Sequence, residues 1–162
     1  MVATRRGAGW RSLGAAILLA VATSVSAAGE RPRVASINAC TDQLVLGLAD
    51  PGQVVTVSEY AASPSFSYMA EAAGPYPVNH GHAEEVLAFD PALVVSGPYT
   101  NRDTTRRLES FGYRVVTLDS PDTFPGIRDN LRRMGELLGH PGRAERLIER
   151  MDRTLAAIAA EL

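Results

Sequence analysis

The segment Glu84–Gly97, EEVLAFDPALVVSG, joins the end of a helix to a complete strand. The helical pattern of residues 83–89 stops at the Asp-Pro pair at 90–91, because proline disfavours helical geometry in the residue before it. Residues 93–95 then form a short apolar run that ends at the Ser-Gly-Pro at 96–98. A strand that is apolar without alternation is typical of a sheet buried on both faces. The segment therefore predicts a helix followed by a fully buried strand.

The same alternation of strands and helices extends along the chain on both sides of this segment. Further β-rich runs are RVASIN at 33–38, VVTV at 54–57 and RVVTL at 114–118. Helices are predicted from a Thr41 cap to residue 49, from an Asn101 cap to residue 111, over 124–138, and over 143–162. Residues 58–81, rich in Ser, Pro, Ala and Tyr, are expected to be irregular. The order predicts an α/β fold, with a short parallel sheet flanked by helices on both faces.

The N-terminal segment, residues 1–27, has the features of a signal peptide. Arg5, Arg6 and Arg11 form a positive region, and the apolar run that follows at 13–25 is too short to span a bilayer comfortably. We expect cleavage near Ala27 and a mature protein in the periplasm. An uncleaved anchor helix is the alternative, and export by the general or by the twin-arginine route remains open.

Size and composition limit the function classes. The chain has 162 residues, which is enough for one domain, and its formal net charge is −2. No excess of basic residues indicates nucleic-acid binding. Cys40 is the single cysteine, so no internal disulfide can form. We expect Cys40 to be a small, half-buried residue, because a catalytic thiol needs a nearby histidine and a third group.

Ligands of open α/β sheets bind beyond the carboxyl ends of the strands, so the loops that follow the strands are the candidate site. These loops contain small, hydroxylic and aromatic residues. None of them combines a nucleophile with an adjacent base, and none resembles a glycine-rich phosphate loop. The loops therefore give no positive indication of an enzyme. A hydrolase on a doubly wound fold is the alternative from another class.

The segment NHGHAEEV at 79–86 has three interpretations. His80, His82 and either Glu84 or Glu85 could ligate zinc or manganese, but a closed site needs three or four ligands that converge. The two glutamates could act as an acid/base pair, but adjacent helical residues point about 100° apart. Acidic residues in the first turn of a helix also interact favourably with the helix dipole. This third interpretation is preferred.

The ordered set of segments RVASINACTDQLVLGLAD (33–50), VVTVSEY (54–60), EEVLAFDPALVVSG (84–97) and LESFGYRVVTLD (108–119) resembles a known family. The family is the periplasmic substrate-binding proteins of ABC importers for cobalamin, ferric siderophores and haem. Its members have two α/β lobes joined by one long helix, with the ligand in the cleft between the lobes. The resemblance implies that residues 28–142 form the N-terminal lobe and that residues 143–162 begin the connecting helix. The resemblance therefore implies that a second lobe is missing here, either because the chain is a fragment or a truncated reading frame or because the partner lobe comes from elsewhere.

The resemblance also implies a function and a site. The expected ligand is an iron–siderophore complex, haem or a corrinoid, and the expected partners are an ABC permease and its ATPase. No catalysis, no cofactor and no nucleic acid are expected, and the full-length form is expected to be a monomer. Glu84 corresponds to an exposed glutamate that engages a permease arginine, with Glu85 as the second choice. His80 and His82 lie at the rim of the cleft, where they either touch the ligand or are solvated. The residues implied to line the ligand are Asn38, Cys40, Thr41, Tyr60, Tyr99 and Asn101.

The last predicted helix has an apolar stripe that one lobe should cover only in part. Leucine, methionine and isoleucine recur at helical spacing, and the opposite face is charged. The stripe consists of Leu147, Met151, Leu155, Ile158 and Leu162.

Overall fold

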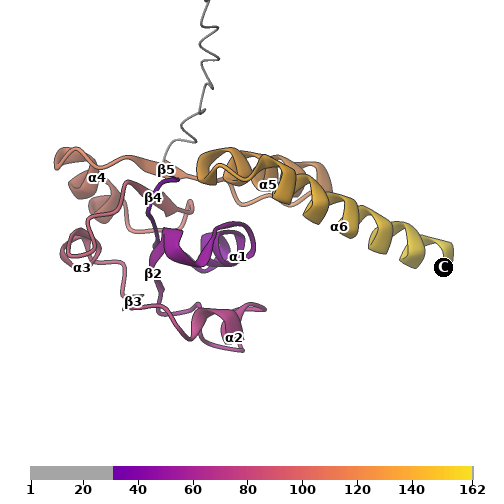
Figure 1. Ribbon diagram of the computed structural model, residues 1–162, viewed down its shortest axis with the longest axis horizontal. Helices are drawn as coiled ribbons and strands as arrows, with labels where there is room; N and C mark the ends of the chain where they lie inside the picture. The colour runs from indigo at the N-terminus through magenta and orange to yellow at the C-terminus, as the bar shows by residue number, and fades with distance from the viewer. Residues whose placement is uncertain (1–30, 162) are drawn as a thin grey trace, which may run out of the picture.

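The computed structural model describes residues 31–161, so the predicted signal peptide and Leu162 lie outside the described residues. Figure 1 shows a parallel sheet with helices packed around it. The five strands are all parallel in the order β3-β2-β1-β4-β5. The strands are β1 (Val34–Ser36), β2 (Val54–Ser58), β3 (Val78–Asn79), β4 (Leu93–Ser96) and β5 (Val115–Thr117). The helices are α1 (Ala39–Leu48), the 3₁₀ turn η1 (Pro51–Gln53), α2 (Ala70–Ala73), α3 (Ala83–Leu87), α4 (Arg102–Ser110), α5 (Phe124–Leu138) and α6 (Pro141–Glu161). The predicted fold class is confirmed.

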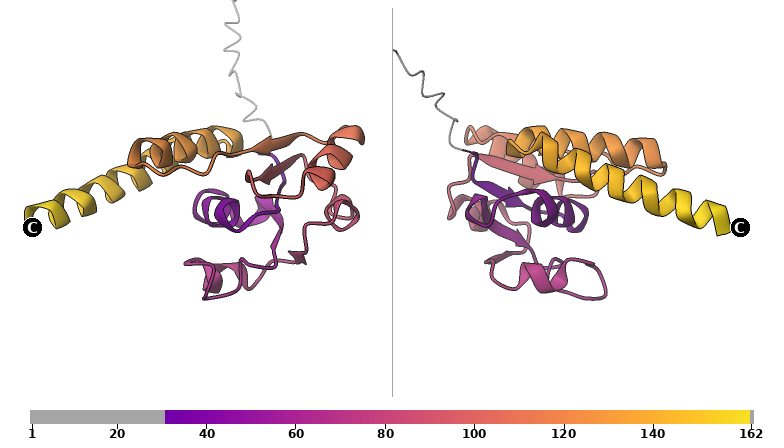
Figure 2. Two further views of the ribbon diagram at one scale, coloured as in Figure 1. Left: turned by 180° about the vertical axis from the view of Figure 1, so that it is seen from behind. Right: turned by 45° about the vertical axis from the view of Figure 1, so that its right-hand side comes forward.

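Both faces of the sheet are buried, as the continuous apolar runs predict. Successive residues of a strand point to opposite faces. Val34 of β1 belongs to the core that includes α1 and α5, whereas its neighbour Ala35 belongs to a second core that includes α3 and α4. Figures 1 and 2 show these helices on opposite sides of the sheet. The short strands are therefore held by packing from two layers of helices.

Two expectations for the N-terminal half are wrong in detail. Residues 58–81 are not wholly irregular, because they contain α2 and the two-residue strand β3, whose residues pair with the end of β2. Thr41 does not cap α1. Asn38 does so, and its Oδ1 accepts a hydrogen bond from the N–H of Cys40 at 3.0 Å. Thr41 lies inside the first turn of the helix and is buried.

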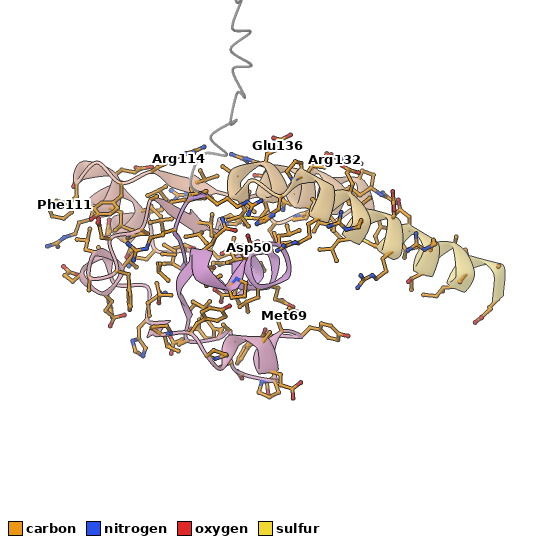
Figure 3. The ribbon with its side chains drawn as sticks, in the orientation of Figure 1. Asp50, Met69, Phe111, Arg114, Arg132 and Glu136 are labelled. Carbon is orange, nitrogen blue, oxygen red and sulfur yellow. The ribbon has the colours of Figure 1, made fainter. Side chains whose placement is uncertain are left out.

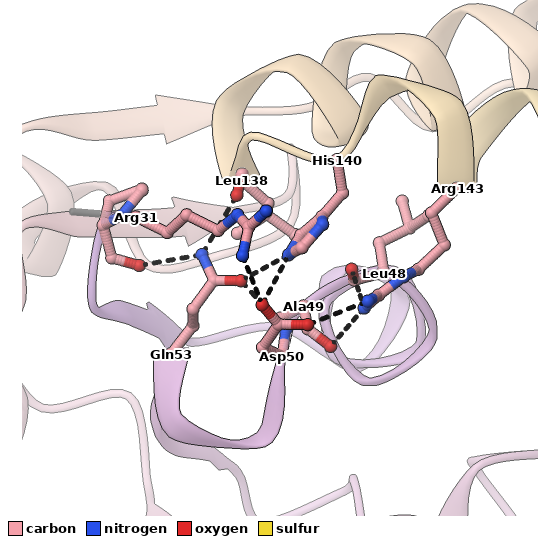
Figure 4. Close-up of polar contacts among 9 residues, drawn as sticks. Arg31, Leu48, Ala49, Asp50, Gln53, Leu138, His140 and Arg143 are labelled. Atoms are coloured by element: carbon pink, nitrogen blue, oxygen red, sulfur yellow. Dashed lines mark hydrogen bonds and ion pairs between the residues drawn. The ribbon is translucent and has the colours of Figure 1, made fainter. Parts of the chain in front are cut away.

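A polar cluster attaches the turn between α5 and α6 to the end of α1 (Figure 4). His140 is buried in this turn, and its Nε2 lies 2.8 Å from Oε1 of Gln53 and 3.2 Å from Oδ2 of Asp50. Arg143 donates to Oδ1 of Asp50 at 2.8 Å. This hydrogen bond is the main reason why the pKa of Asp50 is lowered. Burial lowers the pKa of His140, and the nearby Arg143 charge adds to this effect.

Helix α6 extends past the rest of the molecule (Figure 2). Its first half packs on α5, where Arg132 Nε donates to Glu145 Oε1 at 2.9 Å, and Figure 3 shows Arg132 with Glu136 along α5. The buried residues of α6 are Ala144 and Ile148, neither of which belongs to the predicted stripe. The stripe itself is partly covered at residues 147, 151 and 155, and Ile158 is 51% exposed. None of the helices within residues 31–161 has the length and apolar character needed to cross a bilayer.

Candidate functional site

Two adjoining hollows open where the strands end. The first, called here the histidine-side hollow, has a volume of about 340 Å³ and is lined by the loops that follow β1, β2, β3 and β4. The second, called the helix-side hollow, has a volume of about 400 Å³. It lies between the start of α1, the loops after β4 and β5, and the first half of α5. Asn38 and Tyr99 line both hollows. The site is therefore at the edge of the sheet where an α/β fold is expected to bind ligands.

The structure brings together all six residues that were predicted to line a ligand. Tyr60 and Asn101 line the histidine-side hollow, and Cys40 and Thr41 line the helix-side hollow. Asn38 and Tyr99 form the boundary that the two hollows share. Because parallel strands end at the same edge of a sheet, loops that are far apart in the sequence meet here.

The two tyrosines are available at the surface of the site. Tyr99 is 87% exposed, so its side chain does not serve as packing at the end of the strand. Tyr60 is 44% exposed, and its ring contacts the ring of Phe66 edge-on at a centroid distance of 5.4 Å. The side chain of Tyr99 is therefore almost entirely exposed, whereas the ring of Tyr60 is supported on one side by Phe66.

Cys40 and Thr41 differ in accessibility, although they are adjacent in α1. Cys40 is exposed, so the expectation that it is half-buried is wrong: its position in the first turn of α1 leaves its side chain outside the core. Thr41 is only 1% exposed, and its hydroxyl donates to the carbonyl of Asn38 at 3.0 Å and lies 2.8 Å from Oγ of Ser36. Thr41 thus holds the turn in which Asn38 lies.

A buried carboxylate supports the loop that follows β2. Asp42 is fully buried, and its carboxylate accepts hydrogen bonds from both the N–H and the hydroxyl of Ser58. Burial is the main reason why the pKa of Asp42 is raised, and the hydrogen bonds from Ser58 and Ser36 oppose this effect. Ser58 is the residue from which the chain turns toward Tyr60, so Asp42 fixes the start of that loop.

Asn79, which the sequence analysis did not nominate, is the anchor of the histidine-containing loop. Its side chain is fully buried, and its amide nitrogen donates to the carbonyls of Ser36 and Val57 and to Oγ1 of Thr56, all at 2.9–3.0 Å. Its oxygen accepts from the N–H of Gly81 at 3.1 Å. Nothing in the sequence pointed to this role of Asn79 except its place beside His80. The groups that its side-chain amide nitrogen bonds to belong to other strands, which are distant in the sequence.

The two adjacent glutamates of α3 have different environments. Glu85 turns back and accepts a hydrogen bond from the backbone N–H of His80 at 2.6 Å. This bond is the largest cause of the lowered pKa of Glu85, and the His80 side chain contributes as well. The side chain of Glu84 is 64% exposed and pairs with Arg107 of α4 at 3.1 Å. Neither glutamate lines a hollow.

The histidines do not form a closed site for a metal ion with other side chains. His80 and His82 both line the histidine-side hollow. Within residues 31–161, however, no three His, Cys, Asp or Glu side chains gather in a way that could hold a metal ion. His140 lies in the polar cluster at the turn between α5 and α6. A structural zinc site requires three or four protein ligands, which this arrangement does not supply.

Comparisons with known proteins agree on one kind of protein. The model of a family described as periplasmic binding protein matches residues 34–162. Cobalamin-binding proteins from two strains of Halobacterium salinarum are 30% identical over 139 residues, which is 85% of this chain and 37% of each relative. The chain thus spans well under half the length of these relatives.

Solved structures show the same fold at low sequence identity. A periplasmic heme binding protein from Pseudomonas aeruginosa has a TM-score of 0.69 at 24% identity, over 80% of this chain and 46% of that protein. The periplasmic vitamin B12 binding protein of Vibrio cholerae has a TM-score of 0.63 at 18% identity, over 81% of this chain and 51% of that protein.

Proposed function

This chain belongs to the periplasmic binding protein family, and on that basis we propose that it is the extracytoplasmic solute-binding component of an ABC importer. The proposed ligand is an iron–siderophore complex, haem or a corrinoid, which the protein delivers to a permease and its ATPase. The observation that carries the proposal is the meeting of six predicted ligand residues, from three separate segments, at two adjoining hollows. The proposal includes no catalytic step, in agreement with membership in a family of binding proteins.

The dimensions and lining of the hollows suit a large, flat ligand. Volumes of about 340 and 400 Å³ each fall at the lower end of the range for small-molecule sites. Because Asn38 and Tyr99 line both hollows, a ligand wider than either hollow can extend across them. The exposed ring of Tyr99 and the braced ring of Tyr60 offer aromatic contact area at low entropic cost. The names of the relatives, which bind cobalamin or heme, support this class of ligand.

The proposed docking residue is Glu84. Its side chain is mostly exposed, and within residues 31–161 its only charged partner is Arg107, which is itself 58% exposed. A surface ion pair of this kind contributes little stability and is easily exchanged for another arginine. Glu85 is the weaker choice, because its carboxylate is already bonded to His80. The proposed location is the periplasm, where the family acts.

Ligand binding is tested with the full chain and one representative of each class. Isothermal calorimetry with haemin, aquocobalamin, a ferric catecholate and a ferric hydroxamate should give one-to-one binding for one class. Tyr99→Ala should weaken that binding. Phe111→Ala is the matched control, because Phe111 is also an exposed aromatic residue but lies at the end of α4 (Figure 3) and lines neither hollow. If Phe111→Ala weakens binding as much as Tyr99→Ala does, the ligand does not bind in these hollows.

The zinc or manganese alternative makes an opposite prediction. It requires stoichiometric metal in dialysed protein and loss of that metal in His80→Ala. The structure gives no support to a closed ion site within residues 31–161. Elemental analysis of the dialysed chain therefore separates the two functions, and bound zinc or manganese at one equivalent would refute the proposed chelate-binding role of this segment.

A further inference from the structure

The linings of the two hollows contain carboxylates but no arginine. The side chains in them that are charged at neutral pH are Glu59, in the histidine-side hollow, and Asp119, in the helix-side hollow. The sequence has no lysine, and none of the arginines within residues 31–161 lines either hollow. His80 and His82 supply the only other basic groups of the two linings, and an ordinary imidazole is mostly uncharged above pH 7. The part of the site that this lobe provides is therefore negatively charged.

Four arginines of the lobe show where its positive charge lies instead. Arg33 and Arg114 directly precede β1 and β5, so they lie at the opposite edge of the sheet. Arg128, in the first half of α5, pairs with Asp152 of α6. Arg102, the first residue of α4, lines a third and smaller hollow of about 230 Å³. The fold thus directs these arginines away from both parts of the candidate site.

Glu59 and Asp119 lie at opposite ends of the site. Glu59 directly follows β2, and its N–H donates to the carbonyl of Asn79 at 2.9 Å. Asp119 lies two residues after β5, and its carbonyl accepts from Nδ2 of Asn130 at 2.9 Å. Because β1 and β4 lie between β2 and β5, three strand spacings, about 14 Å, separate the two backbones. Both acidic residues are exposed, and no ion pair within residues 31–161 includes either of them. A ligand that extends across both hollows therefore meets a carboxylate at each end.

Two asparagines in the loops after β1 and β4 supply hydrogen-bond donors between these carboxylates. Oδ1 of Asn38 accepts from the N–H of Cys40 at 3.0 Å, and Oδ1 of Asn101 accepts from the N–H of Asp103 at 2.9 Å. Because each oxygen is engaged by its own helix, the group that each amide offers to a ligand is Nδ2, which donates. A carboxamide on the ligand can accept from these amides and donate to the carboxylates, whereas an ionised carboxylate can only accept. The lining therefore matches a periphery of carboxamides better than one of carboxylates.

We infer that Glu59 and Asp119 make the site selective by charge, in favour of chelates that have no net negative charge and carry peripheral carboxamides. A corrinoid has such a periphery. Haem carries carboxylates and a ferric catecholate is an anion, so both are repelled at the two ends of the site, and repulsion of the wrong ligand is one source of specificity. The inference rests on the proposed function, because it selects among the ligand classes proposed for the same site.

A matched pair of ligands isolates the effect of charge. Dicyanocobinamide and dicyanocobyrinic acid have the same macrocycle and the same metal, but the second carries carboxylates in place of the amides. Isothermal calorimetry of the full chain at pH 8 and low salt should show that the amide form binds at least about tenfold more tightly, because two carboxylates act and each exposed charge pair is worth up to about fivefold. Haemin and a ferric catecholate should also bind more weakly than dicyanocobinamide. The preference should shrink at about 0.5 M salt, which screens exposed charges.

Removing both carboxylates should change the two affinities in opposite directions. The double variant Glu59→Gln, Asp119→Asn should bind dicyanocobyrinic acid about 3–10-fold more tightly, because two repulsive charges are lost. It should bind dicyanocobinamide more weakly, because the ligand amides lose charged acceptors. A variant that is merely destabilised would weaken both. Glu109→Gln is the matched control, because Glu109 is also exposed, lines neither hollow and is in no ion pair within residues 31–161. It should keep the ratio of the two affinities.

The outcomes separate this inference from the proposed function. Equal affinity of the wild type for the amide and carboxylate forms, or tighter binding of haemin than of dicyanocobinamide, would overturn selection by charge and leave the transport role standing. An unchanged affinity ratio in the double variant would overturn it as well. If no chelate of any class binds to the wild type, the proposed function fails and the inference fails with it.

Discussion

Replacing Gly135 with alanine should force α5 and α6 apart. A Cβ atom at position 135 would lie 2.6 Å from Cβ of Ala144 and 3.2 Å from the carbonyl oxygen of His140. Ordinary contact begins at 3.4 Å, so the two helices must separate by about 0.8 Å. Neither neighbour can rotate away, because one is a Cβ atom and the other belongs to the backbone. The methyl group is therefore accommodated by movement of a whole helix.

The magnitude follows from two opposing effects. Overpacking of a filled interior costs about 1–3 kcal/mol. Alanine is a better helix former than glycine by about 0.8–1.0 kcal/mol, which offsets part of that cost. Because both close neighbours are rigid, we expect a net loss of about 1–2 kcal/mol in the free energy of unfolding. For a domain of this size the corresponding fall in Tm is about 3–8 °C.

Thermal unfolding of the full chain, followed by circular dichroism, measures this effect, and Gly47→Ala is the matched control. Gly47 is also inside a helix, but a Cβ atom there would meet only Cδ1 of Leu147 at 3.9 Å, which is ordinary contact. Gly47→Ala should therefore gain about 0.8–1.0 kcal/mol from helix propensity. If the Tm of Gly135→Ala rises as much as that of Gly47→Ala, the packing between α5 and α6 is looser than the structure indicates.

Three further predictions concern charged groups. Glu84→Arg should leave ligand affinity unchanged and reduce permease-stimulated ATP hydrolysis in reconstituted vesicles, because Glu84 lies outside both hollows; loss of ligand binding with intact coupling would contradict the docking role. Burial lowers the pKa of His140 in the folded chain. As the pH drops, the imidazole is therefore protonated at a higher pH in the unfolded chain than in the folded chain, and the free energy of unfolding should fall below about pH 6.5. Urea unfolding at pH 7 and pH 5 should show a smaller fall for His140→Gln, and an equal fall would exclude this histidine as the cause. Burial raises the pKa of Asp42 in the folded chain. The stability that this group contributes is therefore fully present below pH 3.8, its ordinary pKa, and is lost as the pH rises through the raised pKa. Asp42→Asn should remove this loss from the curve of stability against pH, and an unchanged curve would refute the role of Asp42.

The parts of the fold that follow from local pattern were predictable. The bounds of α5 agree with the prediction, because its apolar stripe lies within the helix and its caps, Thr123 and Gly139, are the residues directly beside it. Strand β3 was not predictable in this way. Val78 is 44% exposed, so the strand has no apolar run, and the buried side chain of Asn79 bonds to groups in β1 and β2. A strand that long-range contacts define leaves no periodic signal.

The location of the candidate site was predictable, and its contacts were less so. Parallel topology alone places the loops after the strands at one edge, so the candidates for ligand contact came together as expected. The inward turn of Glu85 depends on the turn at residues 80–82, including the positive φ of Gly81, and adjacent glutamates look equivalent in the sequence. Asn38 and Thr41 are both residue types that can cap a helix. Asn38 caps α1, and the hydroxyl of Thr41 is instead hydrogen-bonded to Ser36.

The position of β1 in the middle of the sheet has a consequence for the way the protein folds. Val34 pairs with Val54 on one side and with Leu93 on the other. The second pairing closes a loop that contains β2, β3 and α3, and the chain entropy of that loop is lost before the contact stabilises anything. We therefore expect the pairing of β1 with β4 to be a late and slow event. A chain that emerges N-terminus first leaves one edge of β1 open until residues 93–96 arrive, and during that interval the open edge can pair with strands of other chains.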